Sequence, residues 1–228
     1  MPDLYTREIP ATDPRLKRHV VHDPRSKGFV VPESNINRAT WRDRKIRVYD
    51  PRPNPNQTVG NCTAVAKAIQ FNAVGNRRRG VILGMPYAMS LYSLETQIDP
   101  FPGSYPPDDT GSNGLASCKA AQQKGDGGAY YWITSGADGV VQAVMDGDVV
   151  SVGTEWDNDM FTPDSEGRVH PGGGVAGGHQ WTCRGYWKDR DWILGRCWWG
   201  EFRDFWIARA DLDNLLRNDG DAHVQERA

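Results

Sequence analysis

The two halves of the 228-residue chain carry different periodic patterns, and this order restricts the fold more than any other feature. Helix-forming runs, with apolar residues three or four apart, begin near Thr63, Pro86 and Ser112. Beyond about residue 140 a short helix is expected first. The later runs are rich in β-branched and aromatic residues, and some alternate, as in HQWTCRGYW from His179. Helices followed by strands predict an α+β protein with two lobes, not alternating βαβ units.

These patterns divide the chain into four stretches. Residues 1–48 have scattered prolines and charges without a sustained period, and we expect an irregular N-terminal extension. Residues 49–140 are expected to form a helical lobe and residues 141–215 a β lobe, which leaves residues 216–228 as a C-terminal tail. The first helix is expected to continue through a basic last turn to a stop at Gly80.

The composition excludes several classes of protein. The formal net charge is −2, so no basic excess points to a nucleic-acid partner. No apolar run approaches the ~20 residues that a membrane-spanning helix needs. The first residues, MPDLYTREIP, contain no apolar core of a secretory signal, and a cytoplasmic protein with reduced thiols is expected.

Cys62 stands where the sequence changes from turn residues to helix formers, in PNPNQTVGNCTAVAKAIQFN. A thiol at a helix N-terminus has a lowered pKa, because the N–H groups and the helix dipole favour the thiolate. The other cysteines are Cys118, Cys183 and Cys197, and no pair has the short spacing of a zinc or redox motif. We therefore expect no metal and no cofactor. Buried cysteines are usually inert, so Cys62 needs a partner to be a candidate nucleophile.

His179 is the candidate partner. Of the five histidines, three lie in the polar ends of the chain, which leaves His170 and His179. His179 follows the glycine-rich GGVAGG and begins an alternating strand, where a close approach to its ring is easy. An imidazole beside Cys62 would hold the thiolate as an ion pair and later protonate a leaving group.

Four ordered segments resemble papain-like cysteine peptidases, and are closest to their bacterial or phage-type branch. They are GNCTAVAKAIQF, DDTGSNGLASCKAAQQKG, GGVAGGHQWTCRGYW and DWILGRCWWGEFRDFWIARADL, within residues 47–215. The resemblance implies a two-lobed papain-like fold, with the cysteine helix in the helical lobe and the histidine in a barrel-like β lobe. It also implies a peptide or protein substrate.

The resemblance assigns roles to individual residues. It implies that Cys62 is the nucleophile, that His179 is the general base and that Trp199 shields the imidazole from water. The family's oxyanion-stabilising glutamine corresponds to Gln57 after a one-residue shift, or to Asn56 without one. Both side chains carry amide N–H donors, and the backbone N–H of Cys62 would be the second donor.

The chain departs from the family at the third catalytic position. Cys197 stands where the family has the asparagine that orients the imidazole, and a shift of one residue offers only Arg196. A thiol is a weak donor and a weak acceptor, so it holds an imidazole less firmly than an amide does. Asp191 and Glu201 lie near the same segment and are alternative third members. A slow enzyme with two catalytic residues, one with a relocated third member, and an inert protein all remain open.

The sequence therefore leaves three functions open. The first is a thiol peptidase that cleaves peptide bonds through Cys62 and His179. The second is a catalytically weak or inert component of a phage or bacterial assembly, whose partners are other subunits of the particle. The third is a cell-wall amidase or endopeptidase of the Cys–His type, acting on a peptidoglycan peptide. We expect Cys62 to be the most reactive thiol and to face His179 across a cleft, with Cys197 beside the imidazole.

Overall fold

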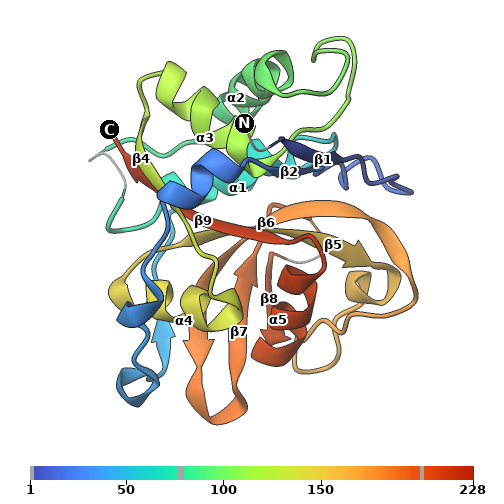
Figure 1. The fold of residues 1–228 in the computed structure, drawn as a ribbon. Helices are drawn as coiled ribbons and strands as arrows, with labels where there is room; N and C mark the ends of the chain where they lie inside the picture. The colour runs from blue at the N-terminus through green and yellow to red at the C-terminus, as the bar shows by residue number, and fades with distance from the viewer. Residues whose placement is uncertain (1–2, 77–79, 201–202) are drawn as a thin grey trace.

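The computed structural model describes residues 3–76, 80–200 and 203–228 and has the predicted α+β architecture (Figure 1). Helices α1 (Cys62–Phe71), α2 (Met85–Ile98) and α3 (Gly114–Gln123) pack together in one lobe, above a large antiparallel sheet (Figure 1). Each part has its own apolar core. Ile69 and Leu91 belong to the core between the helices, and Trp156 and Trp181 to the core against the sheet.

The sheet has seven strands and is antiparallel throughout. Six strands follow one another in the order β4 (Gly127–Trp132), β9 (Asp221–Arg227), β5 (Val150–Asp157), β6 (Val175–Trp187), β7 (Trp192–Arg196) and β8 (Asp204–Ala208). The short β3 (Arg44–Lys45) pairs with β6 as well. Helices α4 (Gly136–Asp146) and α5 (Arg209–Arg217) pack against each other on the lower lobe (Figure 1).

Helix α1 is fully buried along its whole length, between α2 and β6, but it is shorter than predicted. It ends at Phe71 and does not continue to Gly80. The side chain of Asn72 explains the early end. Its amide exchanges two hydrogen bonds of 2.8 Å with the backbone of Leu83, which turns the chain toward α2. The predicted basic turn at Arg77–Arg79 lies outside the described residues.

The strands of the second half lie where alternation predicts them, but two elements near the end were not predicted. Residues Arg209–Arg217 form a helix, because Leu212 and Leu215 share one buried face three residues apart. The expected C-terminal tail contains β9, which fills the place between β4 and β5. His223, expected in a polar end, is therefore completely buried. Backbone pairing with both neighbours outweighs the polar composition of this strand.

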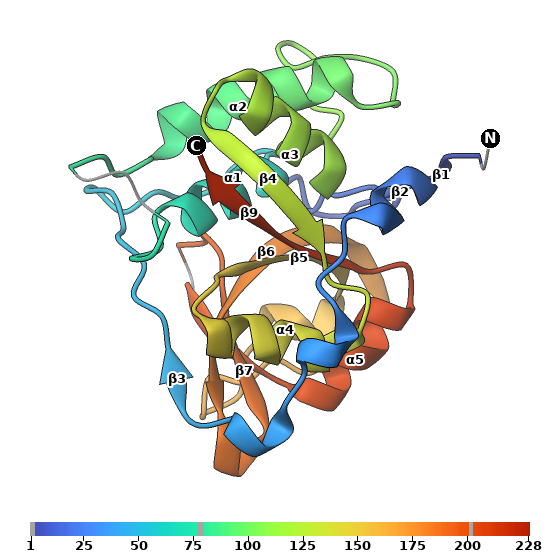
Figure 2. The same cartoon turned by 60° about the vertical axis from the view of Figure 1, so that its left-hand side comes forward.

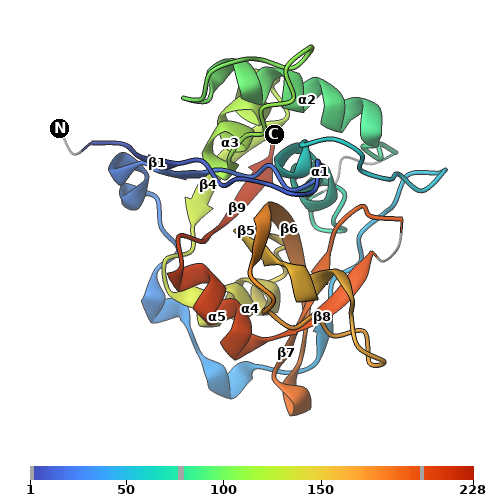
Figure 3. The ribbon, with the colours of Figure 1, turned by 90° about the vertical axis from the view of Figure 1, so that its right-hand side faces the viewer.

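The N-terminal region has little regular structure and follows a long path. Strands β1 (Tyr5–Arg7) and β2 (Val20–His22) pair with each other, and the chain joining them runs between the two lobes (Figure 3). Three short 3-10 turns follow, at Pro24–Gly28, Glu33–Asn35 and Arg38–Thr40. Along them the chain descends past α4 and returns upward through β3 (Figure 2). No helix in the described part of the chain is both long and apolar enough to cross a membrane.

Candidate active site

Cys62 is the first residue of α1 and is completely buried. The backbone N–H groups of Gln180 and Lys17 lie close enough to its sulfur to lower the pKa of the thiol, and Gln180 directly follows His179 on β6. The structure thus places the thiol against the strand that carries the candidate base. Burial raises the pKa of the Cys62 thiol to about 12, while these N–H groups act in the opposite direction. In this conformation Cys62 is a neutral thiol.

His179 lies on β6 opposite Thr154 of β5 and is completely buried among aromatic rings. The centre of its imidazole is 4.5 Å from the ring centre of Trp199 and 5.2 Å from that of Trp156. Neither ring nitrogen has a hydrogen-bond partner within the described ranges. Burial, and then the positive charge of Arg15, lower the pKa of His179 to about 3. The imidazole is therefore neutral, and Trp199 lies where a shield against water would have to lie.

The two oxyanion candidates differ in their surroundings. The side-chain amide of Gln57 donates to the carbonyl oxygens of Arg15 and Val59, at 3.0 and 2.9 Å. Its oxygen accepts a hydrogen bond of 3.1 Å from the indole N–H of Trp199. Asn56 instead accepts a hydrogen bond of 2.8 Å from the backbone N–H of Gly200. Gln57 thus already binds a peptide carbonyl between the lobes, whereas the Asn56 side chain is bound to a loop.

Cys197 directly follows β7, the neighbour of β6, and is buried in the same core cluster as Trp199. Arg196 pairs with Thr182, so Cys197 lies beside the part of β6 that carries His179. The alternative Asp191 is occupied elsewhere, since it binds Arg209 at 2.9 Å and the hydroxyl of Tyr186 at 2.8 Å. Tyr186 is seven residues from His179 along β6, about 23 Å in an extended strand, so Asp191 is no third member. Glu201 lies outside the described residues.

Residues 12–19, the cleft segment, run between the lobes across this site. Thr12 and Arg18 donate to the carbonyl oxygens of Ala176 and Gly178 on β6, at 2.8 and 2.9 Å. On the other side, Ser112 donates to the carbonyl of Lys17 at 3.0 Å and accepts from His19 at 2.8 Å. A strand of the chain itself is thus hydrogen-bonded to both walls of the cleft.

Glycine is required on both walls. A Cβ atom at Gly178 would overlap the carbonyl oxygen of Arg18, and one at Gly111 would overlap that of Lys17. Gly111 also has a positive φ of 83°, which other residues rarely adopt. The two glycines therefore let the backbone of the cleft segment approach both sides closely.

Side chains fix the cleft segment as well. Arg18 is completely buried, forms an ion pair with Asp221 and donates to the carbonyl of Asp219 at 3.1 Å. The guanidinium of Arg15 lies 4.5 Å from the ring centre of Trp199, and the side chain of Leu16 is fully buried. The segment therefore both excludes water from Cys62 and His179 and places a positive charge beside the imidazole.

Sequence reasoning missed the cleft segment and its two acidic partners, Asp109 and Asp221. The motif that begins with Asp108 was recognised as the start of a helix, but a carboxylate pointing into the cleft has no local signature. A possible signal was the basic run from Arg15 to His19, interrupted only by Leu16, inside an otherwise irregular stretch. No group of three or more His, Cys, Asp or Glu residues in the described part of the chain could hold a metal ion.

Solved structures similar to this one include cysteine proteases and their precursors. Xylellain, a cysteine protease from Xylella fastidiosa, matches with a TM-score of 0.72 over 99% of this chain and 100% of its own, at 17% identity. Procathepsin B from Trypanosoma congolense matches with a TM-score of 0.57 over 92% of this chain and 86% of its own, at 12% identity. A C39-like peptidase from Bacillus anthracis has a TM-score of 0.53 over 82% of this chain and 100% of its own, at 12% identity.

The chain therefore has the papain-like α+β fold, and the predicted fold class is confirmed. These neighbours also support the resemblance of the sequence to papain-like cysteine peptidases. No protein-family model matches the sequence, and no curated protein matches it by sequence. At identities of 12–17% the likeness is one of fold, so any chemistry has to be argued from the residues of the cleft.

Proposed function

We propose that the chain is a thiol peptidase whose nucleophile is Cys62 and whose base is His179, closed in this conformation by its own cleft segment. One observation carries the proposal. Residues 17–19 lie extended beside the thiol and pair with Gly178 on one side and Ser112 on the other, and the carbonyl of Arg15 in the preceding turn accepts from Gln57. A groove that binds an extended backbone on both sides suits a peptide or protein substrate.

Release of the cleft segment would change the charge state of the pair. Water would then reach the site, and the end of burial, which is the main cause of the shift, raises the pKa of His179. The charges of Arg15 and Asp13, which act on His179 in opposite directions, would leave together. Hydration also lowers the pKa of Cys62, because burial is the main cause of its rise. The thiol proton then passes to the imidazole. The resulting ion pair lies at the N-terminus of α1, whose dipole favours the thiolate.

The chemical steps follow from this pair. The Cys62 thiolate attacks the substrate carbonyl carbon, and the negative charge on the oxygen is stabilised by the Gln57 amide and the backbone N–H of Cys62. The imidazolium gives its proton to the leaving amine as the C–N bond breaks, which leaves a thioester on Cys62. Neutral His179 then takes a proton from water, which attacks the thioester and releases the acid.

Cys197 would make this a slow peptidase. Packing of Trp199 and Trp156 against the imidazole supplies some of the orientation that the family's asparagine provides by hydrogen bonding. The resemblance to the bacterial or phage-type branch rests on sequence motifs alone. On the same ground we extend the proposal to a place in a phage or bacterial particle.

The test is covalent labelling of the full-length Arg18→Ala variant, in which we expect the cleft segment to be released. A peptidyl epoxide is added near pH 6 and the modified cysteine is mapped by mass spectrometry. We expect modification at Cys62, and none at that position in the Cys62→Ala control. Slower labelling is expected for His179→Gln. First modification at Cys118, Cys183 or Cys197 would contradict the assignment of the nucleophile.

An inert scaffold is the second candidate, and the burial of the pair favours it. Cys62 and His179 are both fully buried and neutral, and the orienting amide is replaced by a thiol. A scaffold predicts that Cys62 reacts with a small electrophile once uncovered but that no peptide is cleaved. Cleavage of peptidoglycan peptides, but not of protein substrates, would instead point to a cell-wall endopeptidase.

A further inference from the structure

The side chain of Lys17 is 28% exposed and lies among Gly60, Gly111 and Asp109, and the space that it fills is called the recess here. Gly60 and Gly111 form its sides, since a Cβ atom at Gly60 would lie 2.7 Å from Lys17 Cδ, and one at Gly111 2.7 Å from Lys17 Cβ. Asp109 closes the far end, where Lys17 Nζ lies 3.1 Å from Oδ2 and also donates to the Asp109 backbone carbonyl. The recess thus accepts an unbranched stem and ends in two oxygen acceptors.

The Asp109 carboxylate is held in place without the help of Lys17. The hydroxyl of Tyr92 donates to Oδ1 at 2.6 Å, and the backbone N–H of Gly60 donates to Oδ1 and Oδ2 at 3.0 and 3.2 Å. Tyr92 is fixed in turn, because its hydroxyl accepts from the N–H of Gly111 at 2.8 Å. When the cleft segment leaves, the carboxylate remains oriented toward the recess, as a preorganised binding group must.

The recess adjoins the bond that Cys62 would attack. Gly60, which lies against the Lys17 stem, is two residues before Cys62 in the sequence, and the Lys17 backbone N–H is close enough to Cys62 to lower the pKa of its thiol. Any residue whose side chain fills the recess therefore has its own backbone at the nucleophile. Beyond Cβ, the Lys17 side chain lies against Gly60 at Cδ and binds Asp109 at Nζ, so these contacts depend on the side chain and not on the direction of the peptide.

We infer that Asp109 makes this recess a lysine-selecting subsite, so that the peptidase proposed above cleaves its substrates next to a lysine. The inference rests on that proposed function and adds the substrate class. The ammonium group of lysine is compact and carries three N–H donors, which suits the carboxylate and carbonyl oxygens of Asp109 at the end of the recess. A glutamate would meet like charge, and an uncharged stem would leave the carboxylate without its cationic partner.

The test compares two irreversible peptidyl electrophiles that differ at one residue, lysine or norleucine, at the position that enters the recess. The protein is the full-length Lys17→Ala/Arg18→Ala variant, which empties the recess and releases the cleft segment. We expect the lysine probe to modify Cys62 about tenfold to a hundredfold faster, the range for a hydrogen bond to a charged group. Addition of Asp109→Asn should bring the ratio of the two rates close to one. The matched control is Asp108→Asn, which removes an exposed charge from the neighbouring residue and should leave the ratio high.

The outcomes separate the two proposals. Equal modification of Cys62 by both probes would overturn the lysine inference and leave the peptidase proposal standing. A lysine preference that survives Asp109→Asn would also overturn it. Failure of both probes to modify Cys62 would overturn the peptidase proposal and the inference with it. Should Asp109→Asn fail to fold, the rate ratio measured with Asp109 present still decides the question.

Discussion

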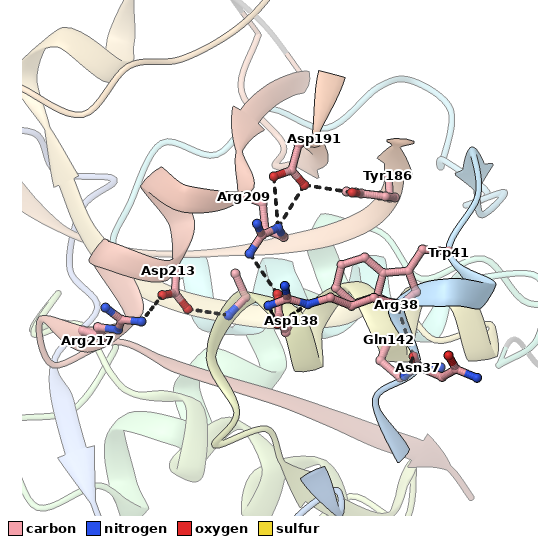
Figure 4. Close-up of polar contacts among 11 residues, drawn as sticks. Asn37, Arg38, Trp41, Asp138, Gln142, Tyr186, Asp191, Arg209, Asp213 and Arg217 are labelled. Carbon is pink, nitrogen blue, oxygen red and sulfur yellow. Dashed lines mark hydrogen bonds and ion pairs between the residues drawn. The ribbon is translucent and has the colours of Figure 1, made fainter. Parts of the chain in front are cut away.

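Two of the places where the N-terminal region is attached to the rest of the molecule differ in kind. The cleft segment is held by its backbone and by a buried ion pair between Arg18 and Asp221, whose side chains are 0% and 4% exposed. The second attachment, residues 37–41, is called the strap here and lies on α4 (Figure 4). There Arg38 pairs with Asp138, and its side chain is 64% exposed.

The strap is held by contacts with side chains, and these contacts depend on the particular residues of the strap and of α4. The backbone N–H of Asn37 and the indole N–H of Trp41 both donate to the Gln142 side chain, at 2.9 and 3.0 Å. Figure 4 shows Asp138 between Arg38 and Arg209, the latter at 2.8 Å. In the proposed peptidase, a peptide substrate would replace the backbone bonds of the cleft segment but not the side-chain contacts of the strap. Under this proposal, the chain uncovers its cleft and remains attached through the strap.

The largest expected effect comes from a matched pair of variants, Arg18→Ala and Arg38→Ala. Loss of one partner of a buried ion pair costs about 3–5 kcal/mol, so Arg18→Ala should release the cleft segment. Alkylation of Cys62 by iodoacetamide should then be faster by about a hundredfold or more. An exposed pair contributes about 0–1 kcal/mol, so Arg38→Ala should change the rate by less than about fivefold. Equal effects of the two variants would remove the distinction between the attachments.

Of the two attachments, only the one at the cleft should make the free energy of unfolding depend on pH. The folded structure lowers the pKa of His179 from 6.5 to about 3, chiefly by burial. Between these values the unfolded chain binds a proton that the folded chain does not, so stability falls as the pH drops below about 6.5. Relative to His179→Gln, wild type should lose about 2 kcal/mol of unfolding free energy between pH 7 and pH 5, measured in urea. A constant difference would mean that His179 is not buried as a neutral ring.

The unfolding free energy of wild type has to be compared with that of His179→Gln because other buried groups titrate in the same pH range. Burial lowers the pKa of His223 well below its usual value and raises that of Glu95 to about 7. The proton on Glu95 acts with the opposite sign, since the folded chain holds it more tightly. Both contributions cancel when wild type and His179→Gln are compared. The same comparison in Arg38→Ala should give the same curve.

Replacement of Cys197 tests whether the covered site can catalyse peptide cleavage. In the Arg18→Ala background, Cys197→Asn should raise peptide cleavage about tenfold, because an amide oxygen orients the imidazole better than a thiol. The measurement is hydrolysis of a fluorogenic peptide, with the rate of Cys62 alkylation as a control for the opening of the cleft. Unchanged hydrolysis with a reactive Cys62 would favour the inert scaffold.

The smallest effect is expected at the centre of the strap contacts. Asp138→Asn weakens the pairs with Arg38 and Arg209, which are both partly exposed, and should cost about 1 kcal/mol of unfolding free energy. Cys62 alkylation should stay within about twofold of wild type, since the cleft segment keeps its own contacts. A large increase in alkylation would show that the strap and the cleft segment are released together.

Local pattern was sufficient for the elements that carry the candidate pair. The change from turn residues to helix formers placed the start of α1 at Cys62, and alternation placed His179 on β6, because both periods are properties of neighbouring residues. The end of α1 was missed, since the side chain of Asn72 reaches a partner eleven residues away. Strand β9 was missed because its polar residues are buried only through pairing with β4 and β5.

The sequence by itself determined the α+β class, the helix-start cysteine and the order of the motifs. Only the tertiary structure brought Lys17 to Asp109, 92 residues away, and Arg18 to Asp221, 203 residues away. It also decided the charge of the pair. From sequence, a helix N-terminus predicts a lowered pKa for Cys62, but burial under the cleft segment raises it to about 12. Moving the thiolate out of water costs more free energy than a helix N-terminus restores. How far the thiol is removed from water depends on which parts of the folded chain cover it.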